Sequence, residues 1–167
     1  MGSGKSLAAK SLHNELGLPS FSTDSLIEQK EKRPISAIFK DSGEAYFREL
    51  EYQAVKELAA KQGIIIDCGG GVVLNPENIR LLKKNGMVFY LKASAEVIYE
   101  RVKREKHRPL LQVDNPLEKI KALILERQAL YEQADFIVDA NDKSVSVPVE
   151  EILKKVREGL WQNKKHY

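Results

Sequence analysis

The chain has 167 residues, of which 43% are hydrophobic and 31% charged, and its formal net charge is +3. This length is most simply one domain, residues 1–167, with a sizeable core. The mild positive charge favours a small anionic ligand over DNA, which calls for a strongly basic face. No apolar run approaches the roughly 20 residues that cross a bilayer, and the first residues lack the charged and apolar segments of a secretory signal. The single cysteine, Cys68, excludes an internal disulfide and fits a reducing compartment. We therefore expect a cytoplasmic monomer without nucleic-acid or membrane partners.

Residues 1–6 contain Gly-Ser-Gly-Lys-Ser, the second half of the phosphate-binding pattern G-x-x-x-x-G-K-[ST]. Gly2 and Gly4 leave room for backbone N–H groups to surround phosphate oxygens. Lys5 supplies a cation for the phosphates, and the hydroxyl of Ser6 suits a Mg²⁺ ion. The helix that follows would direct its positive end to the same place. The alternative interpretation is a flexible, tag-like start that happens to read Gly-Ser-Gly.

Apolar spacing and turn residues divide the rest of the chain into alternating helices and strands. Helices are predicted over residues 5–16, 25–32, 34–40, 42–61, 76–85, 95–106, 116–131 and 149–161. Extended or apolar runs that predict strands lie at residues 20–24, 64–68, 87–91 and 136–138. The run Ile-Ile-Ile-Asp-Cys at 64–68, with its consecutive β-branched residues, is typical of a parallel strand buried on both faces.

This alternation predicts an α/β fold, in which a parallel sheet carries helices on both faces in three layers. Ligands of such folds bind beyond the carboxyl ends of the strands. Asp24 and the glycines at 69–71 come directly after predicted strands. We therefore expect them to line the same crevice as the phosphate-binding loop.

Six motifs occur in the order seen in shikimate kinases, and together they span nearly the whole chain. They are GSGKS at 2–6, FSTDSLIE at 21–28, GEAYFRELE at 43–51, GGG at 69–71, RPLL at 108–111 and ERQALY at 126–131. The chain thus resembles the shikimate kinase family, which has the P-loop kinase type of fold. The resemblance implies transfer of the γ-phosphate of ATP to the 3-hydroxyl of shikimate, in aromatic amino-acid and chorismate biosynthesis, with ATP and Mg²⁺ as cofactors. Two alternatives remain at this point: another small-molecule P-loop kinase, acting on gluconate or a nucleotide, and a non-catalytic nucleotide-binding relative.

The resemblance assigns the nucleotide site to the loop and two arginines. The residues that it implies for nucleotide binding are Gly2, Ser3, Gly4, Lys5, Ser6, Leu7, Arg101 and Arg108. Ser6 is the implied metal ligand. Arg108 belongs to an expected lid at about residues 105–115, which would close on the transferring phosphate and exclude water. Lys5, Asp24 and Arg108 are the expected catalytic residues.

The acceptor site implied by the resemblance consists of Asp24, Arg48, Gly69, Gly70, Gly71 and Arg127. The two arginines would hold the carboxylate of shikimate through paired, charge-assisted hydrogen bonds. Asp24 would orient or deprotonate the attacking hydroxyl, and Glu51 would orient Arg48. Pro148 falls in the loop that the family places beside adenine. Taken alone, the same residues also fit surface arginines, a helix cap at Asp24 and a plain glycine turn.

The chain departs from the family pattern at several positions. The usual Asp-x-Asp reads Ser22-Thr23-Asp24, so a hydroxyl replaces a Mg²⁺-associated carboxylate. Leu7 replaces a hydroxyl residue, and Cys68 replaces a threonine. The family also has a first strand, inside the sheet, before the loop; without it, neighbouring strands would carry unpaired backbone groups. We therefore expect the natural chain to begin about 8–12 residues earlier, or this form to be destabilised.

Overall fold

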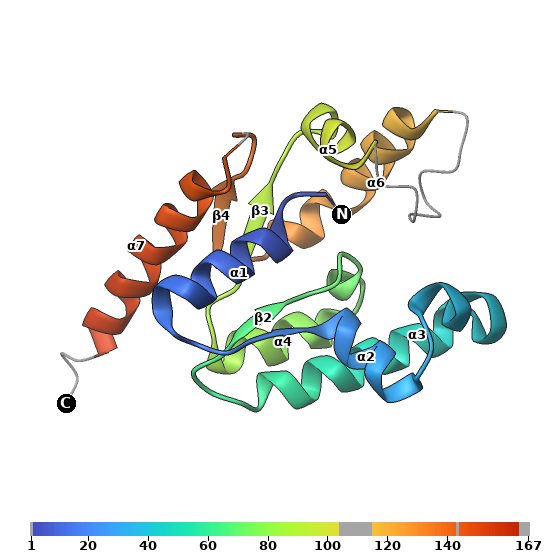
Figure 1. Cartoon of the computed structure of the whole chain (residues 1–167), viewed down its shortest axis with the longest axis horizontal. Coiled ribbons are helices and arrows are strands. Elements are labelled where there is room, and N and C mark those ends of the chain that lie inside the picture. Colours follow the sequence, from blue (N-terminus) through green and yellow to red (C-terminus); the bar gives the residue numbers. More distant parts are fainter. Residues whose placement is uncertain (1, 104–114, 143, 164–167) are drawn as a thin grey trace.

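The computed structural model describes residues 2–103, 115–142 and 144–163 (Figure 1). Its elements in chain order are α1 (Lys5–Leu16), β1 (Ser20–Ser22), α2 (Thr23–Glu31), α3 (Ile35–Ala59), β2 (Ile65–Asp67), the 3₁₀ helix η1 (Val72–Leu74), α4 (Pro76–Asn85), β3 (Phe89–Lys92), α5 (Ala95–Val102), α6 (Pro116–Tyr131), β4 (Phe136–Asp139) and α7 (Ser146–Asn163). Among the described residues, no helix is both long and apolar enough to span a membrane.

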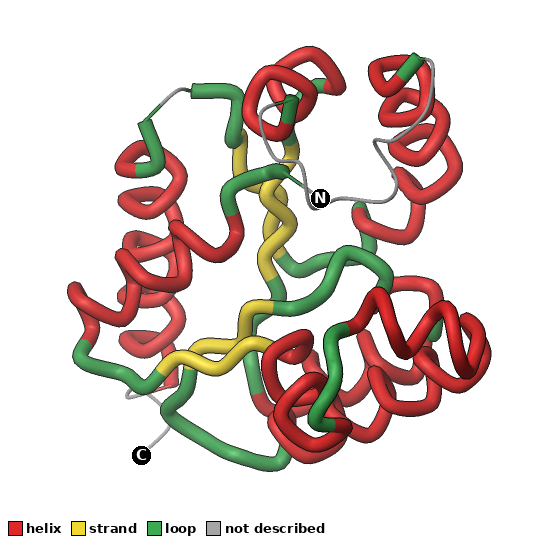
Figure 2. The backbone as a smooth tube through the Cα atoms, turned by 45° about the vertical axis from the view of Figure 1, so that its right-hand side comes forward, coloured by secondary structure: helices red, strands yellow, loops and turns green. Residues whose placement is uncertain are grey.

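The strands form two parallel ladders, β1 with β2 and β3 with β4. The first ladder ends with Ser22 opposite Asp67, and the second with Lys92 opposite Asp139. No ladder joins β2 to β3 within the described ranges. Figure 2 shows the strands in the middle of the molecule with helices on both sides. This arrangement confirms the predicted α/β class.

Side-chain caps set the start of three helices at the predicted positions, residues 76, 95 and 116. The Oδ1 atom of Asn75 accepts the N–H of Glu77 at 3.0 Å, with proline at the first position of α4. The hydroxyl of Ser94 begins α5 in the same way, and Asn115 begins α6 ahead of its own proline. These caps satisfy N–H groups that have no partner inside the helix.

The start of α2 differs from the prediction. The hydroxyl of Ser22 accepts the N–H of Ser25 at 3.3 Å and caps the helix, which begins at Thr23. Asp24 therefore lies in the first turn rather than at the cap. There its carboxyl group lies beside the helix end without a capping bond.

Three further elements, α3, α7 and β2, can be compared with their predictions. The helices predicted over 34–40 and 42–61 correspond to the two helical segments of α3, which are separated by a kink at Gly43, where φ is 79° and ψ is 173°. Glycine adopts this conformation without strain, and the break lies close to the predicted position. Helix α7 begins at Ser146, so Pro148 lies in its first turn and not in a loop. Strand β2 is half-buried rather than fully buried, because its only partner among the described strands is β1.

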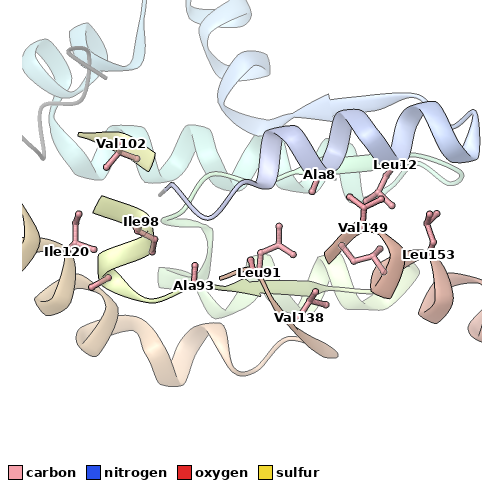
Figure 3. Packing of buried hydrophobic residues seen from close by; sticks show 13 residues of the cluster. Ala8, Leu12, Leu91, Ala93, Ile98, Val102, Ile120, Val138, Val149 and Leu153 are labelled. Carbon is pink, nitrogen blue, oxygen red and sulfur yellow. The ribbon is translucent and has the colours of Figure 1, made fainter. Parts of the chain in front are cut away.

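The largest buried cluster joins α1 and α7 to β3, β4, α5 and α6 (Figure 3). Its members are Ala8, Leu12, Leu91, Ala93, Ala95, Ile98, Val102, Ile120, Val138, Ala140, Val149, Ile152 and Leu153. Ala8 and Leu12 anchor α1 to this cluster, and truncating a buried leucine of this kind costs about 2–5 kcal/mol. Two smaller clusters hold α3 against α4 and η1, and α3 against α2. The N-terminus of α1 is thereby fixed relative to the strands.

Candidate active site

The loop before α1 is a backbone cradle at the N-terminus of the helix. Gly2 and Gly4 have left-handed φ values of 67° and 90°, which glycine adopts without strain. A Cβ at Gly2 would lie 2.7 Å from Cγ1 of Val102, so a larger residue does not fit there. In α1, all of which is described, the first turn holds no acidic residue and no side-chain cap. Its N–H groups and its positive end are therefore open to an anion such as phosphate.

Ser6 connects the first turn of α1 to the end of β2. Its hydroxyl donates a hydrogen bond to Oδ2 of Asp67 at 2.6 Å. Two oxygens of the kind that Mg²⁺ prefers thus lie together beside the loop. Leu7, the next residue, is 63% exposed, and its side chain offers no polar atom to a nucleotide.

Arg101, in the last turn of α5, has its guanidinium beside the same loop. Its Nη2 donates to the backbone oxygen of Asp142, while its Nη1 is buried with no partner among the described residues. A Cβ at Gly4 would lie 4.0 Å from Nη1. A buried donor without an acceptor is costly, and a phosphate oxygen at the loop would satisfy it. Arg108 and the rest of the expected lid, up to residue 114, lie outside the described residues.

On α3, Arg48 is held by two carboxylates. Its Nη1 donates to Oε2 of Glu51 at 2.8 Å, and its Nη2 donates to Oε1 of Glu44 at 2.8 Å. The side chain of Glu51 is 1% exposed, whereas that of Glu44 is 62% exposed. Burial raises the pKa of Glu51, and the positive charges of Arg48 and Arg127 oppose that rise. The contact between Glu51 and Arg48 is the one that the sequence led us to expect.

The glycine run leaves room for side chains of the site. A Cβ at Gly69 would lie 2.6 Å from Oδ1 of Asp24, and a Cβ at Gly71 would lie 2.2 Å from Nη1 of Arg48. The N–H of Gly69 donates to Oγ1 of Thr23, a fully buried side chain, at 2.9 Å. These close approaches account for glycine at both positions without any bound substrate.

Helix α6 contributes a second guanidinium on the same side. The hydroxyl of Tyr131 donates to the backbone oxygen of Gly70 at 2.7 Å, which fixes this end of α6 against the glycine run. Burial raises the pKa of Tyr131, and the charge of Arg127 opposes that rise. The same charge acts on Glu51. Arg127, with 20% of its side chain exposed, thus lies in the region that also holds Arg48.

Asp24 lies between the residues of the nucleotide loop and the residues around Arg48. Burial raises the pKa of its carboxyl group, Lys5 opposes the rise, Asp67 adds to it, and Arg48 opposes it. The charges of the nucleotide loop and of the arginine on α3 therefore both act on this one carboxylate. A carboxylate with a raised pKa is suited to accepting a proton from a hydroxyl group.

Three residues of the site were missed in the sequence. Asp67 was interpreted as part of an apolar strand, although an acid at the carboxyl end of a parallel strand is itself a signal for a ligand site. Thr23 and Tyr131 stand inside two of the motifs that carry the family resemblance, but no role was expected for them. Their hydrogen bonds to the glycine run could not be predicted, because each joins distant parts of the chain.

The family model for shikimate kinase matches residues 1–157 of the chain. A shikimate kinase of Thermodesulfovibrio yellowstonii is 43% identical over 155 residues, which cover 93% of this chain and 90% of that protein. A shikimate kinase of a Sulfurihydrogenibium species is 41% identical over 157 residues, covering 94% of this chain and 93% of that one.

Solved structures of the same family share the fold. The shikimate kinase from Acinetobacter baumannii in complex with shikimate has a TM-score of 0.89 and 32% identity, covering 95% of this chain and 89% of that one. A gluconokinase from Sinorhizobium meliloti has a TM-score of 0.57 at 16% identity, covering 98% of this chain and 92% of that one, and therefore shares only the fold. The chain belongs to the shikimate kinase family, whose members are ATP-dependent kinases that phosphorylate a hydroxyl group of shikimate.

Proposed function

We propose that this chain transfers the γ-phosphate of ATP to the 3-hydroxyl of shikimate, with the nucleotide loop on one side of Asp24 and two arginines on the other. The observation that carries this assignment is the position of Asp24. Its carboxylate is acted on by Lys5 of the loop and by Arg48 of the acceptor side. A phosphate donor and a hydroxyl acceptor held by these two groups would meet at this carboxylate.

On the donor side, the chain's task is to hold phosphate oxygens. The N–H groups at the start of α1 and the ammonium group of Lys5 would bind these oxygens, and Nη1 of Arg101, which has no partner in the part of the chain that the structure describes, is a further donor. Ser6 would hold the Mg²⁺ of the nucleotide, which neutralises phosphate charge when bound. The resemblance adds Arg108, from the expected lid, to this group.

On the acceptor side, Arg48 and Arg127 would bind the carboxylate of shikimate. Arg48 is bonded to one exposed and one buried glutamate. The exposed partner, Glu44, is in competition with water and is easily replaced by a substrate carboxylate. The buried partner, Glu51, would keep the guanidinium in position during that exchange. Arg48 is therefore pre-oriented for a planar anion.

Asp24 would orient the 3-hydroxyl toward the phosphate and accept its proton. Phosphoryl transfer asks for little covalent chemistry from the protein, so positioning and charge provide most of the rate. Gly69 contributes by leaving the carboxylate of Asp24 the space that a Cβ would fill.

The working unit that we propose is a single domain, residues 1–167, acting as a cytoplasmic monomer without nucleic-acid or membrane partners. The chain's mild net charge of +3 and its single cysteine support this. Light scattering after size-exclusion chromatography, with and without MgADP, checks the oligomeric state: a mass near 18.9 kDa is expected.

The substrate assignment is tested by measuring ADP release from MgATP with shikimate, gluconate and AMP in parallel. We expect turnover with shikimate alone. Turnover with gluconate or AMP in its place would refute the acceptor site, and nucleotide binding without turnover on any acceptor would refute the catalytic assignment.

A further inference from the structure

Asp67 is a carboxylate at the nucleotide loop to which the assignments above give no role. It is the last residue of β2, and its Oδ2 accepts the hydrogen bond of Ser6 at 2.6 Å. The two residues are 61 positions apart, so only the fold brings them together. Both line a groove of about 400 Å³ beside α1, β1 and α2. Their oxygens are therefore open to a hydrated ion.

The pairing of β1 with β2 relates Asp67 to the main departure of this chain from the family pattern. Ser22, which stands where the pattern has a Mg²⁺-associated carboxylate, is the register partner of Asp67. Neighbouring strands lie about 4.8 Å apart. The hydroxyl of Ser22 brings no charge and caps α2 by accepting the N–H of Ser25. The family pattern has a negative charge at the end of β1, at position 22. In this chain the charge lies at the end of the neighbouring strand, β2, on Asp67.

The neighbouring carboxylate, Asp24, is directed at the glycine run and not at Ser6. Its Oδ1 lies against Gly69, 2.6 Å from the position that a Cβ would take there, and the charges of Lys5, Asp67 and Arg48 all act on it, so it stands between the loop and the acceptor side. Among the described residues, the carboxylate that contacts Ser6 is that of Asp67.

We propose that Asp67 replaces the carboxylate that the family pattern has at position 22, and that it holds the Mg²⁺ of the bound nucleotide together with Ser6. The inference rests on the proposed function, because it requires a MgATP site at residues 2–7. Mg²⁺ in phosphate sites takes one or two carboxylates in addition to phosphate oxygens and water. P-loop enzymes bind this ion with the same pair of ligands, a hydroxyl of the loop and an aspartate at the end of a strand.

The test measures metal binding with ADP and without shikimate, so that it does not depend on turnover. Asp67→Asn keeps the size of the side chain and one acceptor oxygen for Ser6 but removes the charge. We expect the Mg²⁺ concentration that half-saturates the ADP complex, measured by titration calorimetry, to rise at least about tenfold. Binding of Mn²⁺ to the same complex, measured by electron paramagnetic resonance, should weaken in parallel. ADP affinity in EDTA should stay the same or rise, since a negative charge near the diphosphate is lost.

Two further variants make the test specific. Asp139→Asn removes a matched carboxylate at the end of β4 and should bind metal like the wild type. Ser22→Asp combined with Asp67→Asn returns the charge to position 22, and because aspartate is a good cap, α2 should keep its start. We expect this double variant to recover metal affinity to within about threefold of the wild type, a difference well below 1.4 kcal/mol.

Wild-type metal affinity in Asp67→Asn would overturn the proposal, because the residue would then only position Ser6. If the double variant bound metal as weakly as Asp67→Asn, the proposal that the carboxylate at position 67 takes the place of one at position 22 would be contradicted. A failure of the proposed function has a different signature: the wild type would not turn over shikimate, while its metal-dependent ADP binding would remain measurable.

Discussion

Arg48 and Glu51, one turn apart on α3, form an ion pair of 2.8 Å in which the carboxylate side chain is 1% exposed. Removing one member of such a pair leaves a buried, uncompensated charge. We expect Arg48→Met to lower the free energy of unfolding by about 3 kcal/mol, measured by chemical denaturation. The variant should also lose shikimate binding, measured by titration calorimetry.

A second change separates the two effects. Adding Glu51→Gln to Arg48→Met removes the unpaired charge, so most of the lost stability should return while shikimate binding stays absent. If Arg48→Met were as stable as the wild type, the pair would not compensate the burial of Glu51, and our account of its role would be wrong.

Arg127 is expected to act on shikimate and not on the nucleotide. Losing one charge-assisted hydrogen bond to a carboxylate costs about 1.5–3 kcal/mol. Steady-state kinetics of Arg127→Ala should therefore show a rise of about tenfold to a hundredfold in KM for shikimate, with KM for ATP nearly unchanged. Lys119→Ala, an exposed position on the same helix, is the control. Unchanged shikimate kinetics in Arg127→Ala would show that the carboxylate site is misplaced.

Gly71 tests how closely the glycine run fits Arg48. The Cβ of Gly71→Ala would lie 2.2 Å from Nη1 of Arg48, so the guanidinium must move. We expect weaker shikimate binding with unchanged ADP binding, both measured by calorimetry. Gly86→Ala is the control for a tight Cβ contact that involves no residue of the site, since its Cβ would lie 3.3 Å from the backbone oxygen of Leu82. Equal shikimate affinity in Gly71→Ala and Gly86→Ala would contradict the close approach of Gly71 to Arg48.

The pKa of Asp24 predicts a pH dependence with a definite sign. Burial raises this pKa. As the pH is lowered, Asp24 therefore takes up its proton earlier, at a higher pH, than an ordinary aspartate does. The acid limb of kcat/KM for shikimate should therefore lie above the range of an unperturbed aspartate. An acid limb at the ordinary aspartate value would contradict the burial of this group.

The same shift makes a prediction for stability. A carboxyl group whose pKa is raised in the folded state stabilises the fold when it is protonated. This contribution to stability is present below the pKa of the unfolded state and is lost as the pH rises through the pKa of the folded state. The ionised form at neutral pH is thus the less favourable one. Asp24→Asn should unfold at the same or higher denaturant concentration at pH 7, while its kcat falls by about 10²- to 10⁴-fold. A variant that is clearly less stable would show that ionised Asp24 contributes to folding.

The elements that could be predicted are those determined by local chemistry. Asn75 and Asn115 each precede a proline at the first position of a helix, and the caps follow from these residue types alone. Ser22 and Asp24 are both good caps, and the sequence offered no means of choosing between them. The choice depends on where β1 ends, which its pairing with β2 determines.

The candidate site was predictable as a set of residues but not as a geometry. The motifs indicated Arg48 and the glycine run, yet the approach of Arg48 to Gly71 is a packing relationship that no local pattern contains. Asp67 was missed for a similar reason. Its bond to Ser6 links residues 61 positions apart, and in the sequence its charge only ends an apolar run.

The central claim is that the nucleotide loop and the two arginines serve one reaction, the phosphorylation of shikimate at its 3-hydroxyl. Phosphorus NMR, with correlation to the ring protons, on a mixture of the chain, MgATP and shikimate tests it most directly. Our account predicts one new phosphate monoester, at the 3-oxygen, formed in equal amount with ADP. Release of ADP and inorganic phosphate without an ester, or an ester at a different oxygen, would contradict it.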